Sequence, residues 1–220
     1  MLYKGNWKAN YPTMLFNDFV EVNSFLNFEF KNIFGEELDW IWDESGNVYF
    51  GGTNKKEKYE GKGVCKYKLG YVYRGFFSDG MWTKQGELYA DYGKVYTGQF
   101  FKASFEGKGT MYFRDGRKYI GRFHKGEMQG EGKMIYQDGK IEEGFYKESL
   151  MHGKGTVTFP DLSCLEGIYE KGKLQGRAVF VKRHDQYEDY YLRVYKDGEM
   201  ISEKQTSKKP KLKKTFCCFF

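Results

Sequence analysis

The feature that most constrains this chain is a repeat with a period of 23 residues. It is clearest where aromatic and glycine residues stand in the order Tyr119, Gly121, Phe123, Gly126, Gly130, Gly132, Tyr136 and Gly139. One period earlier stand Tyr96, Gly98, Phe100, Ala103, Gly107, Gly109, Phe113 and Gly116, and one earlier again Tyr73, Gly75, Phe77, Gly80, Lys84, Gly86, Ala90 and Gly93. A fixed period of this length predicts a stacked array whose units cannot fold alone.

Less regular units extend the pattern toward both ends. Glu142, Ser149 and Leu162 replace pattern residues in the unit after residue 141, and a further unit runs from Leu165 to Ala178. Residues 3–10 match the opening half of a unit and residues 35–46 the closing half, which predicts a first unit split by an insertion at 11–34. We expect about seven units in one continuous domain. The expected boundaries are a split unit at 1–46, tandem repeats at 47–201 and a tail at 202–220.

Each unit is predicted to be a β-hairpin. Aromatic and polar residues alternate from Tyr119 to Phe123, and a period of two indicates a strand. The chain can reverse at Gly126, and a second short strand around 134–136 ends at the turn dipeptide before Lys140, Asp138-Gly139. The glycine pair Gly130 and Gly132 requires a reason, because glycine weakens a strand interior. We expect an aromatic ring of a neighbouring strand to lie flat on the backbone there, where no Cβ intervenes.

The repeated pattern resembles the MORN repeat, the membrane occupation and recognition nexus family. The resemblance covers most of residues 35–198, and three consecutive units keep nearly all eight positions at unbroken spacing. It implies an all-β fold, an elongated single-layer antiparallel sheet of tandem 23-residue hairpins with an aromatic groove. Some relatives carry a catalytic domain beside the repeats, but this chain has no residues left for one.

Composition agrees with an all-β array whose core is made of rings. Aromatic residues make up 20% of the chain, with 28 glycines and 3 prolines. Two of the four cysteines, Cys65 and Cys164, lie alone inside repeats, which predicts neither a disulfide framework nor a zinc cluster and favours a reducing compartment. No stretch is long enough to span a bilayer, and repeat residues begin at Tyr3, so no signal peptide is expected and synthesis in the cytosol is predicted.

The positive charge is concentrated at the C-terminus. Residues 204–220 hold Lys204, Lys208, Lys209, Lys211, Lys213 and Lys214 and no acid, leaving 30 basic and 30 acidic residues before them. With Cys217 and Cys218 between phenylalanines, the tail has the composition of a membrane contact, since lysines near an anionic leaflet contribute about 1 kcal/mol each and acyl groups would add a second anchor. The last four residues also fit the loose prenylation format, although poorly. The alternative is a solvated basic terminus or one docked on a neighbouring protein.

The sequence predicts no enzyme, with no catalytic residue, metal ligand or cofactor. Gly107-Lys108-Gly109-Thr110 resembles a phosphate-binding loop, but it lies on the repeat's own glycine pair and lacks the strand-to-helix context. His124, His152 and His184 fall in different units and are expected at the surface. Adjacent acids such as Glu142-Glu143 should point to opposite faces of a strand, whereas paired catalysis needs convergence. Cysteine in a strand usually acts as a small hydrophobe.

The segment from residue 11 to residue 34 is rich in phenylalanine and too apolar for a free linker. Its residues fit a helix capped by Asn17 or a strand, and the pattern does not decide between them. We expect it to cap the open end of the sheet, which arrays require, and the alternative is a partner-binding element.

Two function hypotheses follow. In the first the chain is a non-catalytic scaffold in a cytoskeletal, ciliary or membrane-associated assembly, binding protein subunits through Tyr73, Phe77, Tyr96, Phe100, Tyr119, Phe123, Tyr146 and Tyr169. Those rings are discounted as contacts if the sheet stacks them on one another. In the second the chain tethers itself to an anionic membrane, with the lipid contacts Lys208, Lys209, Lys211, Lys213, Lys214, Cys217 and Cys218. Self-association through sheet ends is compatible with both, and no nucleic-acid partner is expected.

Overall fold

The computed structural model describes residues 3–4 and 40–212, and these contain strands and turns but no helix. The chain divides into two compact units, residues 1–81 and 82–220. The first unit contains β1 (Tyr3–Lys4), β2 (Trp40–Trp42), β3 (Val48–Thr53), β4 (Tyr59–Lys66) and β5 (Val72–Ser78). The second contains β6 (Met81–Ala90, from its second residue), β7 (Gly93–Phe101), β8 (Ser104–Tyr112), β9 (Lys118–His124), β10 (Glu127–Ile135), β11 (Ile141–Lys147), β12 (Leu150–Thr158), β13 (Cys164–Glu170), β14 (Lys173–Arg183), β15 (Glu188–Lys196) and β16 (Glu199–Thr206).

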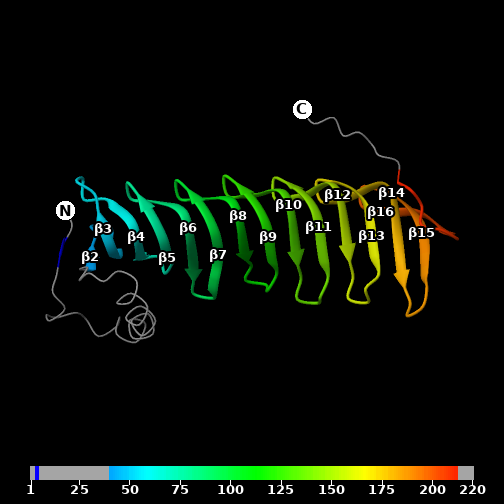
Figure 1. The fold of residues 1–220 in the computed structure, drawn as a ribbon, viewed down its shortest axis with the longest axis horizontal. Coiled ribbons are helices and arrows are strands. Elements are labelled where there is room, and N and C mark those ends of the chain that lie inside the picture. Colours follow the sequence, from blue (N-terminus) through cyan, green and yellow to red (C-terminus); the bar gives the residue numbers. More distant parts are fainter. Residues whose placement is uncertain (1–2, 5–39, 213–220) are drawn as a thin grey trace, which may run out of the picture. The chain divides into compact units, whose positions relative to one another are not determined.

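Within each unit every strand pairs antiparallel with the next strand in sequence. The order is β1 to β5 in the first unit and β6 to β16 in the second. Figure 1 shows β6 to β13 in this order. Such consecutive pairing follows from short connections, which keep sequential strands adjacent. The predicted all-β antiparallel sheet of tandem hairpins is therefore confirmed.

Two kinds of turn alternate along the second unit. In the first kind both central residues have positive φ, as at Lys125 (50°) and Gly126 (88°), the type I′ geometry that suits two-residue hairpins. In the second kind one residue has positive φ, as at Gly116 (83°), whose N–H donates to the Phe113 carbonyl oxygen over 3.0 Å. The predicted turns at Gly126 and at Asp138-Gly139 are both present, and β10 is longer than the short strand expected around residues 134–136.

A row of glycines crosses the second unit. Gly98 lies opposite Gly109, Gly109 opposite Gly121, and Gly121 opposite Gly132. A Cβ at Gly109 would lie 2.6 Å from Cε2 of Tyr96, a separation that real Cβ atoms do not show. The prediction that a ring rests on glycine backbone is therefore confirmed at Gly109 and Gly132, the second glycine of each pair. It is wrong at Gly130, which has a φ of 76° and only Arg122 atoms within 4 Å of an added Cβ.

The rings pack on one another in the core, which they share with aliphatic side chains such as Leu88, Met134 and Val179. The Tyr96 ring stacks on Phe105 at 4.1 Å between centroids and meets Phe100 and Phe123 edge-on at 5.0 and 5.1 Å. Offset and edge-to-face pairs of this kind stabilise by roughly 0.5–1.5 kcal/mol each beyond the buried area. We call this side of the second unit the ring face, and the opposite side, which carries Thr97, Gln99, Ile120 and Arg122, the open face.

The sheet extends further than the predicted start of the tail at residue 202. It runs to Thr206, so residues 202–206 belong to β16 and Lys204 lies in a strand. At the N-terminus Tyr3 pairs with Trp42, while the predicted capping insertion at 11–34 lies outside the described residues.

Candidate functional site

The eight rings predicted as partner contacts lie in the core. Their exposed fractions are at most 7%, for Tyr73, Phe77, Tyr96, Phe100, Tyr119, Phe123, Tyr146 and Tyr169. They pack on one another, as in the Tyr119–Tyr146 edge contact at 5.0 Å between centroids. The prediction that they form a partner surface therefore needs correction, because the sheet itself uses the rings as its hydrophobic core.

A hollow of the second unit lies on the open face instead. It is a groove of about 500 Å³ that extends from β6 to β10. Its lining residues are Gln85, Thr97, Gly98, Lys108, Gly109, Thr110, Ile120, Gly121, Arg122 and Glu131. Because the glycine row forms part of the lining, a ligand there would meet backbone flanked by side chains of neighbouring strands.

The groove combines an apolar side chain with two cations. Ile120 is 42% exposed although it lies in a strand, and Lys108 lies directly opposite Arg122 in the β8–β9 register. Both cationic side chains are exposed, and no ion pair joins either of them to a carboxylate within residues 40–212. By contrast, Lys133 next to the groove is neutralised by Glu143, with 2.9 Å between Nζ and Oε1. The arrangement favours an anionic group beside an apolar one.

The Gly107–Thr110 segment contributes three of these residues. It lies inside β8, where it pairs with β9, and so it is not a loop that directs free amides at phosphate. Sequence reasoning identified the segment for its glycines and did not recognise Lys108, Ile120 or Arg122 as functional candidates. The lysine between the two glycines could have been noticed in the sequence. That Lys108 lies opposite Arg122, however, is known only from the pairing of β8 with β9.

The histidines and cysteines considered as catalytic candidates form contacts within the sheet. His124 Nδ1 lies 3.0 Å from Glu106 Oε1 and His184 Nε2 lies 3.1 Å from Asp189 Oδ2, carboxylates that sequence spacing did not reveal. Burial raises the pKa of the Cys65 thiol to about 12, which keeps it protonated and unreactive near neutral pH. Among the described residues no group of three metal-ligating side chains converges.

The predicted separation of the adjacent acids Glu142 and Glu143 is also observed. Glu142 accepts a hydrogen bond from the Tyr136 hydroxyl over 2.8 Å, whereas Glu143 pairs with Lys133 on the open face. The two carboxylates therefore do not converge on one site.

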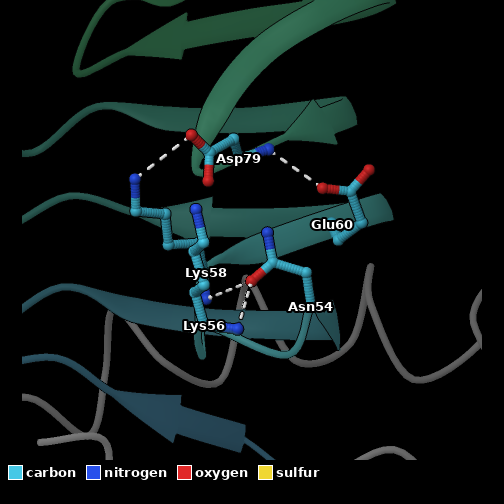
Figure 2. Close-up of polar contacts among 5 residues, drawn as sticks. All are labelled: Asn54, Lys56, Lys58, Glu60 and Asp79. Carbon is cyan, nitrogen blue, oxygen red and sulfur yellow. Dashed lines mark hydrogen bonds and ion pairs between the residues drawn. The ribbon is translucent and has the colours of Figure 1, made fainter.

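A polar cluster in the first unit joins the β3–β4 turn to the end of β5 (Figure 2). The Asn54 Oδ1 accepts hydrogen bonds from the N–H groups of Lys56 and Lys58 over 2.9 and 3.2 Å. Lys58 Nζ lies 3.2 Å from Asp79 Oδ2, and the Asp79 N–H donates to Glu60 Oε2 over 2.9 Å. The hydrogen bond from Lys58 holds the pKa of Asp79 below its ordinary value. Because these side chains bond to turn amides and to one another, the cluster stabilises the turns.

The start of the tail contacts the open face. Lys209 Nζ lies 3.5 Å from Glu166 Oε2 in β13, and the Thr206 hydroxyl donates to the Lys208 carbonyl oxygen over 3.0 Å. Lys208 and Lys211 are exposed. The other predicted lipid contacts, Lys213, Lys214, Cys217 and Cys218, lie outside the described residues. No helix in the described part of the chain could span a membrane.

Comparison with known proteins identifies the repeat. The family model "MORN repeat" matches residues 96–116, 119–141 and 143–164, while no curated protein matches the chain. One similar solved structure is the SAS-4 (dCPAP) TCP domain in complex with a proline-rich motif of Ana2 (dSTIL) from Drosophila melanogaster. It is 12% identical with a TM-score of 0.41, over 78% of this chain and 84% of that one, a likeness too small to carry functional information. MORN repeats suggest a module for protein interaction or membrane association. The hairpins between residues 96 and 164 are therefore three consecutive MORN repeats.

Proposed function

We propose that the chain is a non-catalytic scaffold that binds a segment of a partner protein in the groove on its open face. The observation that carries the proposal is the groove itself, which leaves Ile120 42% exposed among neighbouring strands. Exposed apolar side chains in a concave setting are typical of binding surfaces. The rings supply the rigid core that holds the strands in place, so the groove is formed before a partner arrives.

The setting of this scaffold is proposed to be a cytoskeletal, ciliary or membrane-associated assembly in the cytoplasm. The support is the MORN repeat, which suggests interaction or membrane association. A repeat sheet offers many equivalent positions along its length, which suits a protein that holds partners in a fixed arrangement.

Site-specific photocrosslinking in the cell of origin tests the scaffold. A benzoylphenylalanine at Thr110, inside the groove, should crosslink a defined protein, and the same probe at Lys154 on the open face of β12 is the matched control. Replacing Ile120 with arginine should abolish the crosslink from position 110. Equal crosslinking from both positions, unaffected by Ile120→Arg, would contradict groove binding.

A second candidate function is membrane tethering by the tail. It is favoured by the placement of the whole net charge of +6 after residue 203, since a polybasic segment binds anionic lipid while a neutral body does not. Fractionation with high-salt and detergent washes should compare the full chain with one that ends at Thr206, where β16 ends. Release of only the truncated chain from membranes would support tethering, and retention of both in a detergent-resistant pellet would support the scaffold.

A further inference from the structure

The cross-strand charges of the second unit follow a rule with one exception. Directly opposed charged residues have opposite signs at Lys133–Glu143, Glu170–Lys173, Lys182–Asp189, Arg183–Glu188, Arg193–Glu203 and Lys196–Glu199. Within β6 to β16 the exception is Lys108, which lies opposite Arg122. Like charges directly opposite one another destabilise a sheet, so this pair reduces the stability of the strand pairing, whereas the other charged pairs increase it.

From this exception we infer that Lys108 and Arg122 together bind one carboxylate of an acidic side chain in the partner segment. This inference rests on the proposed function, because it names the chemistry of what the groove holds. Side chains directly opposite in an antiparallel pair start about 4.5–5.5 Å apart at Cβ, so an ammonium and a guanidinium can both reach a single anion. A guanidinium also matches a carboxylate with two parallel hydrogen bonds.

The apolar part of the groove specifies the neighbouring residue of the partner. Ile120 precedes Arg122 by two positions in β9, and Thr110 follows Lys108 by two positions in β8, so both lie on the open face beside the cations. Two positions along a strand correspond to about 7 Å. That is also the distance between residues i and i+2 on one side of an extended peptide. The ligand expected is therefore an extended segment with an acidic residue two positions from an apolar one.

The surrounding charges favour a single carboxylate over an anionic membrane. Glu131 lines the groove at β10, and Glu143 lies beyond it in the ion pair with Lys133. A lipid surface would bring many negative charges against these carboxylates at once, whereas one peptide side chain would meet only the two cations. Residues 82–203 hold 20 basic and 19 acidic residues, so the sheet of the second unit has almost no net charge that would attract a membrane.

The test uses the full chain and a defined probe, the peptide Ac-Ser-Glu-Ser-Leu-Ser-Gly-NH₂, with glutamine in place of glutamate as the matched ligand. Binding is followed by NMR through the Arg122 Nε–H resonance and the β8 and β9 amides. The glutamate peptide should bind at least tenfold more tightly than the glutamine peptide, and the advantage should shrink at high salt. The Lys108→Gln/Arg122→Gln variant should lose this discrimination, and Lys154→Gln, a matched change elsewhere on the open face, should keep it.

A second measurement separates recognition from folding. Arg122→Glu pairs Lys108 with a carboxylate within the sheet, so it should raise the melting temperature while abolishing binding of the glutamate peptide. Equal affinity for the two peptides, discrimination that survives in the double variant, or phosphatidylserine vesicles that bind only when both cations are present would overturn the inference. If the Thr110 crosslink persists in the double variant, the groove binds its partner without this carboxylate contact. If no crosslink forms from Thr110 even in the unaltered chain, the groove function itself fails.

Discussion

At the scale of single residues, the repeat is explained by pairs of groups that need one another. A tyrosine hydroxyl at the start of each regular unit donates to the carbonyl three residues later, as from Tyr49 to Gly52 over 2.9 Å and from Tyr96 to Gln99 over 3.1 Å. The ring then covers a glycine of the next strand, as Tyr49 covers Gly63. Tyrosine and glycine therefore recur because one supplies a ring and a donor while the other leaves room for them.

The glycine requirement predicts a large effect of one methyl group. In Gly63→Ala the new Cβ would meet Tyr49 at 2.6 Å and the Phe50 carbonyl oxygen at 2.8 Å, and this overpacking should reduce the free energy of unfolding by about 1–3 kcal/mol. Gly52→Ala is the matched control, because its closest contact is 3.2 Å, and it should cost less than about 1 kcal/mol. Urea denaturation followed by circular dichroism measures both. Equal effects would contradict the steric explanation.

The hydroxyl predicts a smaller effect. Tyr96→Phe keeps the ring but removes the donor to Gln99, which should cost about 1 kcal/mol. Tyr119→Phe removes a longer hydrogen bond of 3.4 Å to Arg122 and should cost clearly less. Thermal denaturation of the two variants beside the unaltered chain compares them, and a larger loss for Tyr119→Phe would show that the hydroxyl is not the relevant group.

At the scale of hairpins, the turns explain part of the irregular unit after residue 141. Leu162 and Ser149 take positions where regular units have glycine, and both have positive φ, 63° and 64°. The Ser149 hydroxyl accepts a hydrogen bond from the Met128 N–H over 3.2 Å, which offsets the backbone strain. Leu162 is 62% exposed and has no such side-chain hydrogen bond. The Ser149 and Glu142 replacements therefore have separate causes, since Glu142 accepts a hydrogen bond from Tyr136, and nothing in the structure explains Leu162.

Leu162→Gly should stabilise the protein. A left-handed conformation costs a residue with a side chain roughly 1–2 kcal/mol, and glycine avoids this cost. Glycine also has a larger unfolded-state entropy, which opposes folding and reduces the gain, so the net stabilisation should be about 0.5–1 kcal/mol. Leu162→Ala keeps the Cβ and should leave stability unchanged. Denaturation midpoints decide the matter, and equal gains from both variants would point to the exposed leucine surface as the cause.

The β2–β3 turn predicts a pH dependence. The Asp43 carboxylate accepts hydrogen bonds from the N–H groups of Ser45 and Asn47 and from the Tyr59 hydroxyl. Burial is the largest influence on the Asp43 pKa and raises it, but the hydrogen bonds from Asn47, Tyr59 and Ser45 together outweigh it and hold the pKa below its ordinary value. The stabilisation is thus fully present above the ordinary aspartate pKa and is lost as the pH falls through the folded-state value.

Urea midpoints measured from pH 7 down to pH 2.5 check this behaviour. The unaltered chain should lose stability below about pH 4, and Asp43→Asn should be less stable at pH 7 but lose less on acidification. Asp91→Asn, at an exposed carboxylate in the second unit, is the control and should follow the unaltered chain. An unchanged acid slope in Asp43→Asn would remove Asp43 from the explanation.

At the scale of the whole molecule, we expect the last strand of the sheet, β16, to contribute more to stability than the residues after it. β16 pairs along its length with β15, from Tyr190–Thr206 to Lys196–Glu199, and so covers backbone groups that would otherwise form an open edge. A chain that ends at Lys196 should melt several degrees lower and aggregate more readily, while one that ends at Leu212 should melt like the full chain. Differential scanning calorimetry with light scattering compares them, and equal melting of all three would show that β16 adds no stability.

Much of the fold could be predicted from the sequence because its causes are local. The alternation around Tyr119, the turn residues at Gly126 and Gly139, and the glycine pair Gly130 and Gly132 each specify their own geometry. The candidate site could not be predicted in the same way. Whether a ring is exposed depends on the side chains that neighbouring strands pack against it. The sequence shows only that rings recur.

The sequence by itself determined the 23-residue hairpin, its MORN character, and the fit of rings onto glycines. Only the tertiary structure decided that the rings are buried, that the groove lies on the opposite face, and that Lys108 lies opposite Arg122. The physical reason is register. Those two residues are 14 positions apart, and a turn one residue shorter or longer would have placed other side chains opposite each other.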